Sequence, residues 1–120
     1  MEVNQLIEEF KNTLKIESIL MAMGLAFEQN VPVKTPSGKI IPDLVIPSSN
    51  NPKWLIEVWS KPTFNLVNHL SIRYMNVDEN IKTILIGSFQ DNELRIFAEA
   101  YFDYVIDFNS LETLKKVLTA

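Results

Sequence analysis

The sequence predicts one α/β domain in which a mixed β-sheet is flanked by helices. Apolar residues at helical spacing open the chain, compact apolar runs follow them, and a second helical pattern joins two of those runs. A helical crossover makes the strands that it joins parallel, whereas short connections leave neighbouring strands antiparallel. Because 120 residues with an apolar fraction of 47% suit one core, we expect a single domain spanning residues 1–120.

The elements are expected in the order helix, three strands, helix, strand, up to two more strands and helix. Apolar residues recur three and four positions apart from about Val3 to Met23, which predicts the first helix, and Gly24 is expected to end it. A turn at residues 35–38 and a polar loop at residues 47–52 separate the first strands. The other segments are predicted as strands at Leu25–Val33, Ile40–Ile46, Trp54–Trp59, Ile81–Ile86, Leu94–Ala98 and Tyr104–Ile106, and as helices at Phe64–Tyr74 and after Ser110.

Composition narrows the classes of function. The chain has no run of 18 or more apolar residues and is acidic near its start, so we expect no membrane span and a cytoplasmic protein. A net charge of -4 argues against coating nucleic acid by bulk electrostatics, although a local groove can still be basic. Without cysteine, a metal must be held by oxygen ligands or by His69, and carboxylates favour Mg²⁺ or Mn²⁺.

Two acidic residues are the main candidates for chemistry. Glu57 interrupts the apolar run 54–59, and a buried charge without a partner is costly. Asp43 follows Pro42 at the start of the preceding apolar run. If the two runs are neighbouring strands, both carboxylates can lie at one edge of the sheet and share a divalent cation, which can activate water for attack on a phosphodiester.

The segments Ile41-Pro42-Asp43-Leu44-Val45-Ile46 and Leu55-Ile56-Glu57-Val58 resemble the Pro-Asp and Glu-x-Lys strands of the PD-(D/E)xK nuclease superfamily. The similarity covers roughly residues 14–90 and includes the order of helices and strands. It implies a restriction endonuclease-like three-layer core and a metal-dependent DNA endonuclease. By the same resemblance, Asp43, Glu57 and the main-chain carbonyl of Val58 would bind Mg²⁺ or Mn²⁺, with Glu17 of the first helix as an outer ligand.

The chain departs from the family pattern at the lysine. Trp59 stands where the family has the lysine that assists the attacking water, and Lys61 lies on the same strand face about 6 to 7 Å further along. Either Lys61 has taken over this role, or another base such as Lys39 reaches the site, or the site no longer cuts. The alternative to an endonuclease is therefore an inactive nuclease-fold module that binds nucleic acid or protein in a larger assembly.

Each candidate also has a purely structural interpretation. Asp43 can belong to a turn, Glu17 can form an ion pair along its helix, and Lys61 can be solvated at a strand end. Glu57 can form an internal ion pair with Lys39, Lys53 or Arg73, and His69, Trp54 and Trp59 fit packing or surface roles better than metal binding or base stacking. The small size suggests a homodimer or a subunit of a larger complex to position DNA, and the aromatic segment 101–108 is a candidate dimer surface.

Overall fold

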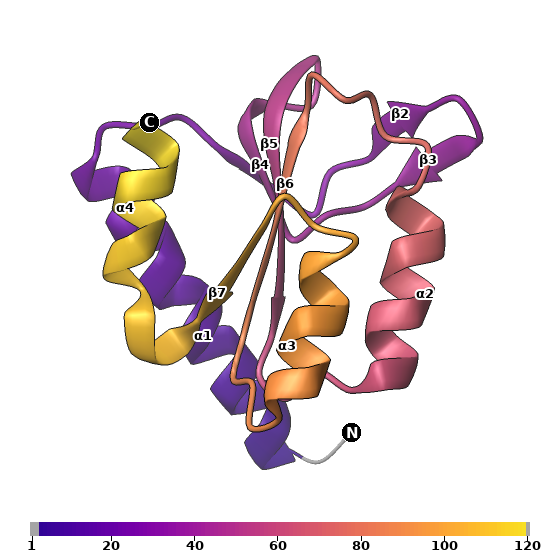
Figure 1. The fold of residues 1–120 in the computed structure, drawn as a ribbon. Coiled ribbons are helices and arrows are strands. Elements are labelled where there is room, and N and C mark those ends of the chain that lie inside the picture. Colours follow the sequence, from indigo (N-terminus) through magenta and orange to yellow (C-terminus); the bar gives the residue numbers. More distant parts are fainter. Residues whose placement is uncertain (1–2, 120) are drawn as a thin grey trace.

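The computed structural model describes residues 3–119. A long first helix is followed by five strands in succession, and helices and strands then largely alternate (Figure 1). They are α1 (Val3–Ala22), β1 (Glu28–Gln29), β2 (Val33–Thr35), β3 (Gly38–Ile40), β4 (Leu44–Ser48), β5 (Asn51–Trp59), α2 (Phe64–Tyr74), β6 (Lys82–Gly87), α3 (Asn92–Glu99), β7 (Tyr104–Asp107), a short 3₁₀ helix η1 (Phe108–Ser110) and α4 (Glu112–Thr119).

A mixed five-stranded sheet in the order β1-β4-β5-β6-β7 forms the centre of the protein. β1, β4 and β5 pair antiparallel, and β5, β6 and β7 pair parallel, so the predicted change of direction at the crossover is confirmed. Helices α1 and α4 cover one face of the sheet, and α2 and α3 cover the other (Figure 1). The fold is therefore an α/β sandwich of three layers. The strands β2 and β3 form a separate hairpin beside it.

The two faces of the sheet carry two separate hydrophobic cores because side chains alternate along each strand. Leu55 and Leu85 point toward α2 and α3, whereas Ile56 and Ile84 point toward α1 and α4. All four side chains are almost fully buried. The near-continuous apolar runs of β5 and β6 are thus explained by burial on both faces, as in other central parallel strands.

The ends of α1 and α2 follow local capping rules. Gly24 adopts a left-handed conformation with φ of 71°, and its N–H donates to the Met21 carbonyl at 3.0 Å. The N–H of Leu25 then reaches back to Leu20, which completes the C-terminal cap. At the start of α2, the Thr63 hydroxyl accepts a hydrogen bond from the N–H of Leu66 at 3.1 Å.

Several predicted segments need correction. Residues 94–98 form a helix, not an edge strand, because Asp91 caps α3 and the buried residues Leu94 and Ala98 are four positions apart. The predicted strand 40–46 is two strands, since Pro42 cannot donate to a ladder and the chain turns between β3 and β4. The predicted strand 25–33 is reduced to the two residues of β1 and the first residue of β2. Most residues of the predicted loop 47–52 belong instead to β4 and β5 and pair with each other at the ends of these strands.

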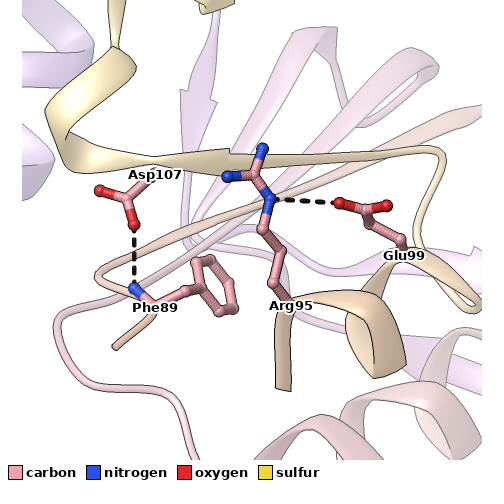
Figure 2. Close-up of polar contacts among 4 residues, drawn as sticks. All are labelled: Phe89, Arg95, Glu99 and Asp107. Carbon is pink, nitrogen blue, oxygen red and sulfur yellow. Dashed lines mark hydrogen bonds and ion pairs between the residues drawn. The ribbon is translucent and has the colours of Figure 1, made fainter. Parts of the chain in front are cut away.

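Two aspartates fix β7 beside β6. Asp103 accepts hydrogen bonds from the main-chain N–H of Thr83 at 2.9 Å and from its hydroxyl at 3.2 Å. Asp107 accepts a hydrogen bond from the N–H of Phe89 at 3.0 Å (Figure 2). The same figure shows the surface ion pair between Arg95 and Glu99 of α3. The two aspartates therefore have structural roles.

None of the helices within residues 3–119 is long and apolar enough to cross a membrane.

Candidate functional site

Asp43 and Glu57 lie on neighbouring segments at one end of the β4–β5 pair. The register that places Leu44 opposite Ile56 brings Asp43, one residue before β4, level with Glu57. Pro42 has no N–H for the ladder, and the Asp43 carboxylate binds the main chain of β5 at this level: its Oδ2 accepts from the N–H of Val58 at 2.7 Å. The topology therefore places the two residues level with each other on neighbouring segments, as the strand order in the sequence predicted.

The carboxylate of Glu57 is buried, and each of its oxygens accepts a hydrogen bond from a protein donor. Only 3% of the residue is exposed. Its Oε2 accepts from the Tyr74 hydroxyl at 2.7 Å, and its Oε1 accepts from the Trp59 indole N–H at 3.0 Å. Trp59 reaches it because residues two apart on a strand share a face. The hydrogen-bond partners of Glu57 are therefore the phenol of Tyr74 in α2 and the indole of Trp59 in β5. From the sequence, an internal ion pair was the structural alternative.

Burial raises the pKa of Glu57 to about 7, and the negative charge of Asp43 adds to the increase. The hydrogen bonds from Tyr74 and Trp59 and the positive charge of Arg73 act in the opposite direction. Burial also raises the pKa of Asp43, against the effect of its bond from Val58. Glu57 is therefore partly protonated near neutral pH, whereas burial and the Glu57 carboxylate raise the pKa of Tyr74 and keep it a donor.

A pocket of about 600 Å³ opens between α1 and the end of the β4–β5 pair. It brings Glu17, Asp43 and Val58 together, as the resemblance implies, but Glu57 does not line it. Its other walls are acidic, polar and apolar: Leu6, Glu9, Phe10, Thr13, Leu14, Gln29 and Asn30. Burial raises the pKa of Glu17, so this helix acid is not simply solvated.

Glu9 is a member of this pocket that the sequence reasoning did not select. Burial raises its pKa, with further contributions from the charges of Asp43 and Glu8, so Glu9 is the α1 acid that is electrostatically coupled to Asp43. The signal was present in the sequence. Glu9 and Glu17 are eight residues apart, roughly two helical turns, and so lie on the same side of α1.

Lys61 does not join the acids. It is exposed and lines a different pocket of about 310 Å³, beside Thr63, Ser88 and Asp91. Lys39 is exposed in the β2–β3 hairpin. The space around Asp43 is therefore lined by acidic, amide, hydroxyl and apolar side chains, without either of the two lysines considered as a base.

The remaining candidates have ordinary structural surroundings. His69 is exposed on α2. Trp54 packs against Tyr104 with ring centroids 5.9 Å apart. Over residues 3–119, no group of three or more histidine, aspartate or glutamate side chains is arranged to hold a metal ion. A cation at Asp43 would have to draw ligands from Val58, Glu9 or Glu17 as well, and both oxygens of Glu57 already accept hydrogen bonds.

No known protein family, curated protein or solved structure matches this chain. The fold and the site define a class of protein, namely a three-layer α/β protein with a mixed sheet. Two acidic residues, Asp43 and Glu57, lie at one end of its antiparallel β4–β5 pair, and the charge of Asp43 raises the pKa of Glu57.

Proposed function

We propose that the chain is a nuclease-like α/β module that does not hydrolyse nucleic acid and acts by binding, as part of a larger assembly. The order of its core supports the relationship to the PD-(D/E)xK superfamily: a helix, an antiparallel meander, a helical crossover and a parallel strand. The positions of Asp43 and Glu57 at the end of the second and third strands of the meander support it as well.

The hydrogen bond from the Trp59 indole to Glu57 is the single observation on which the proposed loss of catalysis rests. In the family pattern, position 59 holds a lysine whose ammonium serves the attacking water and the phosphate. An indole N–H is only a donor and cannot accept a proton from water. Here it occupies one oxygen of the carboxylate that would bind the metal, while Lys61 lies in another pocket.

The second candidate is a metal-dependent DNA endonuclease that uses Mg²⁺ or Mn²⁺. Two observations favour it. The pocket is lined by Glu9, Glu17, Asp43 and Val58, and the charge of Asp43 raises the pKa of Glu57. Carboxylates that repel one another in a cleft are a frequent feature of cation sites, because the ion relieves the repulsion.

Incubation with plasmid, branched and single-stranded DNA in Mg²⁺ and Mn²⁺ separates the two candidates. The proposed module leaves all three substrates intact, and calorimetry detects no Mn²⁺ binding. Cleavage that Asp43→Ala abolishes would overturn the proposal in favour of the endonuclease. Cleavage that persists in Asp43→Ala indicates a contaminating nuclease.

A Trp59→Lys variant extends this test. It supplies an ammonium at the position where the family has its lysine and removes the indole from Glu57. Cleavage gained by this variant, and absent when Asp43→Ala is added to it, would identify Trp59 as the residue that silences the site.

A further inference from the structure

The wall that α1 contributes to the pocket beside Asp43 alternates between apolar and polar side chains. It contains an apolar row and a polar row, and the members of each row are four positions apart on the helix. In sequence order, the residues of the two rows are Leu6, Glu9, Phe10, Thr13, Leu14 and Glu17. Because residues three and four positions apart are neighbours on a helix, acidic and apolar groups lie side by side along this wall.

Glu17 is buried in this wall without a partner from the protein. Only 9% of the residue is exposed. Among residues 6–119, no hydrogen bond or ion pair engages its carboxylate. Every fully enclosed side-chain nitrogen or oxygen of the described region has a hydrogen-bond partner, so the unpaired oxygens of Glu17 open onto the pocket. A carboxylate withdrawn from bulk water in this way favours a positively charged ligand.

The carboxylates of the pocket are spread along it and do not converge on one point. Glu9 and Glu17 are eight residues apart, which separates their Cα atoms by about 12 Å along the helix axis. Asp43 lines the pocket from the sheet. Within residues 3–119, no three acidic or histidine side chains are grouped closely enough to hold a metal ion, and none of the described lining residues is a lysine or an arginine. This arrangement suits an elongated cation with more than one charge better than a compact ion.

From these observations we infer that the pocket binds a linear aliphatic polyamine, in which methylene segments separate the ammonium groups. The ammonium groups pair with the spaced carboxylates. The methylene segments cover Phe10 and Leu14, which are 66% and 44% exposed. The volume of about 600 Å³ is within the usual range of small-molecule sites, and the net charge of -4 attracts a polycation to the protein.

The inference rests on the proposed function, because it names a ligand for the same non-catalytic pocket, and its test contains no DNA. Calorimetry of the full chain with spermidine at pH 8 and low ionic strength should show saturable binding that weakens as salt is added. n-Butylamine has a single ammonium group and should bind at least roughly tenfold more weakly, since it pairs with one carboxylate only. DNA cleavage that depends on Asp43, together with normal spermidine binding, would refute the proposed function alone. Absence of both spermidine binding and cleavage would refute this inference alone.

Substitutions on α1 locate the binding site. Glu17→Gln keeps the shape of the side chain and should weaken spermidine binding by at least roughly tenfold. Phe10→Ala, at an exposed residue that folding does not require, should also weaken it. Glu8→Gln is the matched control and should bind spermidine like the wild type, because Glu8 is exposed and lies nine residues from Glu17, on the opposite side of the helix.

Three results would overturn the inference. The first is an equal loss of spermidine binding in Glu17→Gln and Glu8→Gln, which would indicate general attraction to an acidic protein. The second is equal affinity for spermidine and n-butylamine. The third is Mn²⁺ that displaces spermidine from the pocket and binds it more tightly, which would indicate a metal site.

Discussion

The buried Glu57 should make the protein less stable as the pH rises toward neutrality. Its pKa is raised from 4.5 to about 7 in the folded state. Between these values the folded protein holds a proton that the unfolded chain has released, so the free energy of unfolding falls by about 1.4 kcal/mol per pH unit. The stability contributed by the protonated acid is complete below pH 4.5 and is lost as the pH passes through 7. The total loss is roughly 3 kcal/mol.

The variant Glu57→Gln isolates this effect because it removes the ionisable group and keeps the shape. We expect its unfolding free energy to depend much less on pH between 4.5 and 7 than that of the wild type. Urea unfolding followed by circular dichroism at a series of pH values measures both slopes. The exposed carboxylate of Glu79, removed by Glu79→Gln, is the control. A wild-type stability that increases from pH 5 to 7, or an unchanged slope in Glu57→Gln, would refute the reasoning.

Three further substitutions test contacts of the fold and the site. Tyr74→Phe removes a hydrogen bond that lowers the pKa of Glu57, so the pH midpoint of the stability loss should rise, and stability at pH 8 should fall by about 1 to 3 kcal/mol in urea unfolding. Gly87→Ala should lower the thermal midpoint through a loss of about 1 to 3 kcal/mol, because a Cβ there would lie 2.6 Å from the Trp59 carbonyl. Asp103→Ala leaves the N–H of Thr83 in β6 without its acceptor and should speed the hydrogen exchange of that amide.

Matched controls distinguish these effects from general sensitivity to substitution. Tyr101→Phe alters an exposed phenol and should leave the pH midpoint in place. Gly24→Ala adds a Cβ in open space and should be affected only by its left-handed backbone, at about 1 kcal/mol. Asp78→Ala removes an acceptor within an exposed turn and should not change exchange in β6. Equal effects of Tyr74→Phe and Tyr101→Phe on the pH midpoint, or of Asp103→Ala and Asp78→Ala on exchange in β6, would contradict the assigned contacts.

The sequence predicted the parts of the fold that depend on long periodic patterns. The helical spacing from Val3 to Met23 and the apolar runs of β5 and β6 each correspond to an element in the structure. Short segments were ambiguous, because Leu94, Ile96 and Ala98 alternate like a strand while Leu94 and Ala98 are also four apart like a helix. Packing against α2 and β7, which the sequence does not display, decides in favour of the helix.

The candidate site was predicted at the level of the backbone and not at the level of side-chain contacts. Asp43 and Glu57 lie level with each other because of the order and register of β4 and β5. The local sequence patterns encode this order and register. The donors Tyr74 and Trp59 depend on where α2 crosses the sheet and on the rotamers of buried rings. The sequence pattern placed Lys61 on the same strand face as Glu57. Lys61 lies beyond the end of β5, however, where the alternation of side chains along a strand no longer determines its direction.

The bond between Trp59 and Glu57 makes the protein its own optical probe. The chain has two tryptophans, and the indole of one donates to a carboxylate that changes charge near pH 7. An indole is sensitive to charge beside its ring, so the emission of Trp59 should change as Glu57 gains and loses its proton. Trp54, which packs against Tyr104 with the two rings tilted by 43°, supplies a reference. Any ligand that displaces the carboxylate should then be visible in the emitted light, without a label.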